Sequence, residues 1–118
     1  MSKKSFLLSL ILLLAGCHAA EVTMYSSQRY PPSKFVEVFS DLATIKQEYF
    51  EIGQVEAKGG LTVTKQQLLD DMKEKAQIAG AHALIKVEFY DRERYDPKLG
   101  SYSKPAAKAV MVRYVNVQ

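Results

Sequence analysis

Hydrophobic positions follow two different periods in the second half of the chain. Apolar and polar side chains alternate over residues 47–57 and again over 81–90, which predicts two β-strands. The largely apolar, β-branched residues 106–117 predict a third. Between the first two, residues 64–79 carry apolar side chains at the spacing of an α-helix, namely Leu68, Leu69, Met72, Ala76 and Ala79. The pattern indicates a strand, a helix, and two strands joined as a hairpin.

Local signals refine these elements. Thr64 followed by Gln67 fits a capping box, and Gly80 is placed to end the helix in the left-handed conformation. Gly53 interrupts the first strand, where glycine often marks a bulge or a close approach of backbones. Alternation over 81–90 predicts one face with Ala83, Ile85, Val87 and Phe89 and another with Leu84, Lys86, Glu88 and Tyr90.

The remaining elements complete the predicted fold. Short strands are expected over 22–26 and 35–39, separated by Pro31-Pro32, which removes two backbone donors. Residues 91–105 are predicted to be a polar connection between the hairpin strands. The last strand is apolar on both faces, so we expect it to be central or buried on both sides. The predicted fold class is α+β, with one main helix packed on a mainly antiparallel sheet of four to five strands.

The N-terminus has the composition of an export signal. Lys3 and Lys4 precede an apolar run, Phe6–Leu14, that only Ser9 interrupts. A membrane-spanning helix needs about 20 apolar residues, so this run is too short. Two alternatives remain open at this point: an ordinary secretory signal with an incidental cysteine, and a buried apolar helix.

Leu14-Ala15-Gly16-Cys17 resembles the lipobox of bacterial lipoproteins. The resemblance implies cleavage between Gly16 and Cys17, a diacylglycerol on the Cys17 sulfur, and an acylated new amino terminus. His18 stands where an aspartate would favour the inner membrane, which implies the periplasmic face of the outer membrane, with the inner membrane as the alternative. The expected organisation is a signal peptide (1–16), a lipidated N-terminus with a short tether (17–21), and one α+β domain (22–118).

Composition limits the classes of function. The formal charge of the chain is +3, but loss of Lys3 and Lys4 leaves 14 basic against 13 acidic residues. A nearly neutral domain argues against nucleic-acid binding and predicts little electrostatic attachment to anionic lipid. Cys17 is the only cysteine, so no disulfide can form within the mature chain.

Two segments resemble a family of small domains. Residues 68–76 and 80–85 resemble the helix, Gly-Ala-x-Ala and apolar-strand signature of YbjQ-like domains, and residues 49–55 resemble their Tyr-x-x-Ile-Gly-x-Val strand. RcsF-type envelope-stress lipoproteins look like relatives of the same architecture. The resemblance implies the fold. It does not extend to a metal site or a signalling pathway, because the chain lacks the thiols, the disulfides and the long Pro-rich tether found in these groups.

Catalysis and cofactor binding are not expected. Ser26, Ser27 and His82 could be combined into a nucleophile-and-base scheme, but no glycine-bounded nucleophile elbow supports it. His82 could titrate near neutral pH, or it could be a hydrogen-bonded turn residue. The two histidines do not have the spacing of a zinc site. Beyond the covalent lipid on Cys17, we expect no cofactor and no metal.

Tyrosine and arginine, the residue types common at binding hot spots, gather in and beside residues 91–105. This candidate partner surface consists of Tyr90, Arg92, Arg94, Tyr95, Lys98 and Tyr102, although a merely solvated loop is the alternative. We expect a non-enzymatic, periplasm-facing outer-membrane lipoprotein that binds a protein or an envelope component such as peptidoglycan or lipopolysaccharide, with a role in envelope stress or maintenance. The alternatives are a self-assembling structural oligomer and a module that binds a small ligand or metal.

Overall fold

The computed structural model describes residues 20–116. The predicted signal peptide, its cleavage site and Cys17 lie outside the described residues. Among residues 20–116 there is no helix with the length and apolar character needed to cross a membrane.

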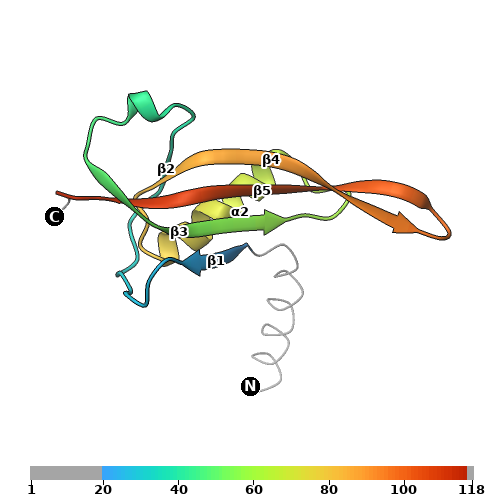
Figure 1. Ribbon diagram of the computed structural model, residues 1–118, viewed down its shortest axis with the longest axis horizontal. Coiled ribbons are helices and arrows are strands. Elements are labelled where there is room, and N and C mark those ends of the chain that lie inside the picture. The colour runs from blue at the N-terminus through green and yellow to red at the C-terminus, as the bar shows by residue number, and fades with distance from the viewer. Residues whose placement is uncertain (1–19, 117–118) are drawn as a thin grey trace, which may run out of the picture.

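The described chain forms a five-stranded sheet with one α-helix against it, which confirms the α+β class (Figure 1). The strand order is β1-β3-β5-β4-β2, and neighbouring strands are antiparallel except for the parallel pair β2 and β4. The elements are β1 (Glu21–Met24), β2 (Glu37–Val38), the 3-10 turn η2 (Leu42–Thr44), β3 (Tyr49–Lys58), α2 (Lys65–Ile78), β4 (Ala83–Asp96) and β5 (Gly100–Tyr114).

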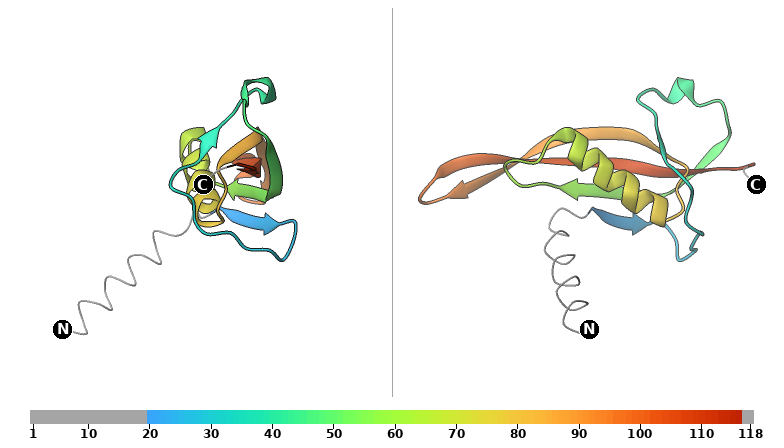
Figure 2. Two further views of the ribbon diagram at one scale, coloured as in Figure 1. Left: turned by 90° about the vertical axis from the view of Figure 1, so that its left-hand side faces the viewer. Right: turned by 180° about the vertical axis from the view of Figure 1, so that it is seen from behind.

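Helix α2 begins and ends where the sequence predicted. The Thr64 hydroxyl accepts a hydrogen bond from the Gln67 backbone, and the Gln67 side chain accepts one from the Thr64 backbone, so the capping box is confirmed. Gly80 follows the helix at φ +89°. The helix crosses one face of the sheet (Figure 2). Its buried residues Leu68, Met72 and Ala76 form the main core with inward side chains of β1, β3, β4 and β5.

Strand β5 lies at the centre of the sheet and is covered on both faces, as its two apolar faces predicted. Met111 belongs to the core beneath the helix. Val112 and Tyr114 belong to a second cluster on the opposite face, which the segment carrying Phe39 and Ile45 covers. Because one chain buries both faces of β5, this strand gives no reason to expect a second copy.

Two irregularities change which side chains share a face. The register between β3 and β5 shifts between Glu51 and Gly53, and a Cβ at Gly53 would collide with the backbone of β1, so the predicted bulge and close approach are confirmed. A second shift lies between Ile85 and Glu88, with Lys86 at φ +53°.

The prediction for the faces of residues 81–90 is wrong because of this second bulge. Ala83 and Ile85 lie in the cluster away from the helix, whereas Leu84 and Val87 contact the core beneath it. Phe89 pairs with Ala107 of that core, so it too is on the helix side. The extra residue in β4 reverses the alternation. No glycine or asparagine at position 86 signalled a positive φ.

The prediction of a polar connection over residues 91–105 is also wrong. Strand β4 continues to Asp96 and β5 begins at Gly100, which leaves only a tight turn between them. Asp96 Oδ1 closes that turn by accepting from the backbone nitrogens of Lys98 (2.7 Å) and Leu99 (3.3 Å). Since β3 ends opposite Ala106, the two strands extend beyond the sheet as a free arm (Figure 1). We call residues 90–106 the ribbon.

Candidate functional site

The ribbon separates its charged side chains onto two faces. Residues directly opposite each other in an antiparallel pair share a face, and faces alternate along each strand. The pairs Arg92–Lys104 and Arg94–Tyr102 therefore share one face, and Asp91, Glu93 and Tyr95 lie on the other. By the same rule Asp96 falls on the face of Arg92 and Arg94, at the turn, where its carboxylate accepts from the backbone nitrogens of Lys98 and Leu99. We call Arg92, Arg94, Tyr102 and Lys104 the basic face, and Asp91, Glu93, Tyr95, Ser101 and Ser103 the acidic face.

The cations of the basic face form no ion pair within the described residues. The ion pairs among residues 20–116 join Lys58 to Glu56, Lys86 to Glu51 and Lys108 to Glu88, and none includes a ribbon cation. Lys104 Nζ lies 5.7 Å from the centre of the Tyr102 ring, a cation–π distance. Exposed Arg94 makes only a 3.4 Å contact from Nη1 to the carbonyl of its neighbour Glu93. Arg94 and Lys104 are thus available to an anion.

The base of the ribbon is tied to the sheet by two of the predicted surface residues. Arg92 Nη2 donates to the Gly59 carbonyl in the loop before α2, at 2.9 Å. The Tyr90 hydroxyl donates to the Glu56 carboxylate of β3. Burial, followed by the hydrogen bond and charge of Glu56, raises the pKa of Tyr90 to about 12. Arg92 and Tyr90 therefore position the ribbon.

The structure accordingly divides the six residues of the predicted surface. Arg94 and Tyr102 face one way, Tyr95 faces the opposite way with 74% of its surface exposed, and Lys98 lies in the turn. Lys104 was missed because residues 91–105 were expected to be irregular. Its spacing of two from Tyr102 is the strand signal that would have placed both on one face.

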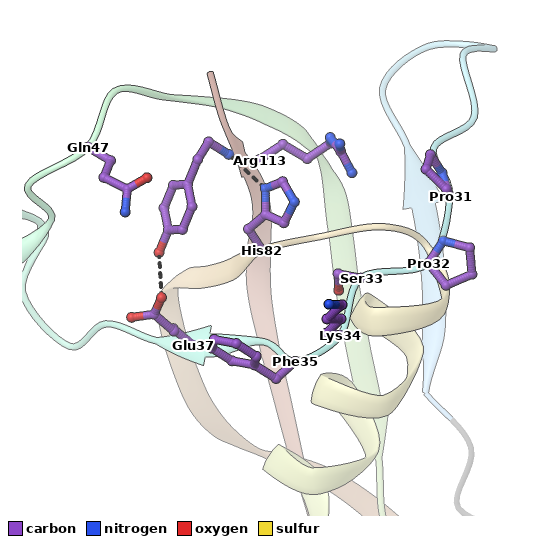
Figure 3. Close-up of a pocket in the computed structure, with 10 residues that line it drawn as sticks. Pro31, Pro32, Ser33, Lys34, Phe35, Glu37, Gln47, His82 and Arg113 are labelled. Atoms are coloured by element: carbon purple, nitrogen blue, oxygen red, sulfur yellow. Dashed lines mark hydrogen bonds between the residues drawn. The ribbon is translucent and has the colours of Figure 1, made fainter. Parts of the chain in front are cut away.

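A pocket of about 470 Å³ lies at the other end of the sheet (Figure 3). Residues 31–35 and the start of β2 form one wall, and residues just before β3 and β4 and the end of β5 supply the rest. Its lining residues are Pro31, Pro32, Ser33, Lys34, Phe35, Glu37, Gln47, His82, Arg113 and Tyr114. Sequence reasoning missed this pocket because its residues come from separate segments that only the fold brings together.

Hydrogen bonds fix the polar groups of the pocket. The Tyr114 backbone N–H donates to His82 Nδ1 (2.9 Å), which assigns the proton of the neutral imidazole to Nε2. The two rings stack with centres 5.4 Å apart, and the Tyr114 hydroxyl donates to Glu37 Oε1 at 3.2 Å. Burial, with a smaller effect from Arg113, lowers the pKa of His82 below 6.5. His82 is thus a hydrogen-bonded turn residue, one of the two roles considered for it.

The Tyr114 hydroxyl and the Arg113 guanidinium are committed to structural contacts. Burial and then Glu37 raise the pKa of Tyr114 to about 12. Arg113 Nη1 donates to the Gly80 carbonyl (2.6 Å), and its guanidinium lies 4.6 Å from the centre of the Tyr30 ring. The pocket therefore offers the His82 Nε2–H as a donor beside a largely apolar wall.

The other groups considered for chemistry do not converge. Ser26 Oγ accepts from the Gln28 backbone (3.2 Å), and no hydrogen bond among the described residues joins His82 to Ser26 or Ser27. In the described part of the chain, no group of three or more His, Cys, Asp or Glu residues is arranged to hold a metal ion.

Comparisons with known proteins give one structural likeness. No protein-family model matches the chain, and no curated protein matches it in sequence, so the resemblance to YbjQ-like domains stays a prediction. The chain is similar to the Francisella virulence factor FvfA, solved in an orthorhombic crystal form, with 20% identity and a TM-score of 0.45. The match covers 80% of this chain and 97% of that one. A likeness at this level says nothing about what this chain binds.

Proposed function

We propose that this chain is a lipid-anchored protein of the bacterial envelope that acts by contact and not by catalysis, with the ribbon as its contact surface. The observation that carries the proposal is the ribbon itself. It leaves the body of the domain as a free two-stranded arm and presents Arg94, Tyr102 and Lys104 together, and none of the ion pairs among residues 20–116 includes Arg94 or Lys104. A free arm with exposed strand edges makes a protein more prone to unwanted association, and the ribbon adds nothing to the packing of the core. A binding role therefore accounts for this surface best.

The anchor rests on the lipobox resemblance of Leu14–Cys17 and on the short link to the domain. Ala20 is buried, with only 6% of its surface exposed, and it packs into the main core. Only His18 and Ala19 separate it from Cys17, so an anchored domain would sit against the membrane. We place it at the periplasmic face of the outer membrane, with the inner membrane as the alternative.

Intact-mass spectrometry of the membrane-extracted protein tests the anchor. We expect the mass of residues 17–118 plus a diacylglycerol and an acyl chain, and we expect Cys17→Ser to remain unprocessed. An unmodified thiol on the exported protein would refute the anchor. Normal processing and fractionation of the Cys17→Ser variant would refute it as well.

Site-specific crosslinking tests the contact surface. A photo-crosslinking amino acid is placed at Tyr102 on the basic face or at Tyr95 on the acidic face of the full chain in its own envelope. We expect crosslinked products from position 102 in clear excess over position 95. Because the two positions belong to the same ribbon, equal yields at both would contradict a directed surface.

A small-ligand module is the second candidate, favoured by the pocket of about 470 Å³. Phe35, 68% exposed on the pocket wall, and the His82 Nε2–H suit a mainly apolar ligand with one hydrogen-bond acceptor. A screen by thermal shift, repeated on His82→Ala, tests this role. A ligand that stabilises both proteins equally would not be bound through the pocket.

A further inference from the structure

We propose that the basic face binds the phosphate groups of anionic phospholipids in the bilayer that holds the anchor. This inference rests on the proposed function, since it requires the domain to be held at a membrane. It names the partner of the ribbon as the lipid surface itself.

The register of the sheet places the start of the domain at the ribbon end. Strand β1 begins with Glu21, which pairs with Glu56 of β3. Glu56 pairs with Lys108 of β5, and Lys108 pairs with Glu88 of β4, two residues before the ribbon. Figure 1 shows the same arrangement, with β1 running away from the ribbon. The chain that leads back to Cys17 therefore leaves the domain beside the ribbon and not beside the pocket.

Short distances keep the bilayer within reach of the ribbon. Three residue steps from Ala20 to Cys17 span at most about 11 Å. Three strand spacings separate β1 from β4, or about 14 Å, and the six pairs from Asp91–Pro105 to Asp96–Gly100 extend the ribbon by about 20 Å. Added end to end, the link to Cys17 and the width from β1 to β4 come to about 25 Å, close to the length of the ribbon, so a lipid on Cys17 would keep the headgroup layer within reach of the ribbon.

Charge complementarity selects anionic headgroups. The mature chain is nearly neutral in total, which predicted little attraction to lipid. The ribbon, however, gathers three cations on the basic face against the single carboxylate of Asp96 at the turn, and it places Asp91 and Glu93 on the other face. Lys98 and the 74% exposed Leu99 extend the surface into the turn. A basic side chain near an anionic membrane strengthens attachment by about fivefold, and an exposed leucine beside it suits the interface.

The experiment uses the full lipidated chain with Leu99→Cys carrying an environment-sensitive fluorophore. The protein is reconstituted into phosphatidylcholine vesicles with or without phosphatidylglycerol. We expect a blue shift of the probe only with phosphatidylglycerol, reversed by high salt because exposed charges are screened. An unchanged spectrum in both vesicles overturns the inference. So does a shift that appears only after envelope proteins are added, which would make the partner a protein.

Two matched variants locate the effect. Arg94→Gln with Lys104→Gln removes two cations from the basic face, and we expect the docking equilibrium constant to fall about 25-fold. Arg29→Gln with Lys46→Gln removes the same charge from exposed loops at the other end of the sheet, outside the pocket lining. We expect a change below about twofold because both positions are beyond a Debye length of about 10 Å from the docked face. Equal losses in the two variants overturn the inference.

The same samples distinguish failure of this inference from failure of the anchor. A lipidated Cys17 leaves one reactive thiol, at position 99, so the labelled protein carries one fluorophore. Two fluorophores per chain refute the anchor and, with it, this inference. One fluorophore with no blue shift overturns the inference alone and leaves the proposed anchor standing.

Discussion

Replacing Gly80 by alanine tests how the helix, the pocket and β5 are held together. Gly80 follows α2 at φ +89°, and an added Cβ would lie 2.6 Å from Tyr30 Cβ and 2.7 Å from the Pro31 carbonyl oxygen. Gly100 is the matched control. It has φ +81°, and no atom lies within 4 Å of the position its Cβ would take.

The two substitutions share one cost and differ in another. A left-handed conformation costs a non-glycine residue about 1–2 kcal/mol, which applies to both positions. Only Gly80→Ala also forces a backbone segment aside, and overpacking of this kind costs about 1–3 kcal/mol more. We therefore expect the free energy of unfolding to fall by about 1–2 kcal/mol for Gly100→Ala and by about 2–5 kcal/mol for Gly80→Ala.

Thermal and urea unfolding of residues 18–118, followed by circular dichroism, measures the difference. One kcal/mol corresponds to about 4–8 °C in the Tm of a domain of this size. Equal losses in the two variants would refute the close approach of Gly80 to the Tyr30–Pro31 segment. A loss for Gly100→Ala as large as that predicted for Gly80→Ala would show that the ribbon turn, not the pocket wall, is the sensitive position.

Two further predictions concern protonation. The pKa of His82 in the folded protein is below its ordinary 6.5, so folding favours the neutral form. The free energy of unfolding is therefore highest above pH 6.5 and falls as the pH drops through the folded pKa. In urea titrations, His82→Gln should flatten this profile. An unchanged slope would contradict the role of the part-buried Nδ1 as a hydrogen-bond acceptor. The pKa values of Tyr90 and Tyr114 are raised to about 12, so the stabilisation by both hydroxyls is complete below pH 10 and is lost as the pH rises through 12. Ultraviolet difference titration should show two late-ionising tyrosines in the wild-type protein and one in the Tyr90→Phe variant. If the variant still shows two, the contact of Tyr90 with Glu56 is refuted.

Elements with local signals could be predicted well. The capping box of Thr64, the apolar stripe through Leu68 and Met72, and the stop at Gly80 depend on residues close in sequence, and the structure confirms each. The bulge at Gly53 was also predictable, because a glycine within a strand often marks a bulge or a close approach of backbones. The structure gives the reason for the glycine, since a side chain there would have no room beside β1.

Elements without local signals were not predictable. Residues 91–105 contain charged residues, two prolines and a glycine, which is the composition of a loop. They form strands because the hydrogen-bond ladder between β4 and β5 continues outward from the body of the sheet, with Asp96 closing the turn. Lys86 has no residue-type signal for its positive φ, so the reversal of faces beyond it could not be read from the alternation.

By itself, the sequence determined the α+β class, the limits of the helix, the central place of β5, and an N-terminus that resembles a lipoprotein signal. Tertiary structure alone decided which charges share a surface. Net charge is a sum over the chain, but a binding surface depends on where each charge lies. Strand pairing brings Arg94 beside Tyr102 and Lys104 and sends Glu93 to the other side, and the fold assembles the pocket around His82 from segments far apart in sequence.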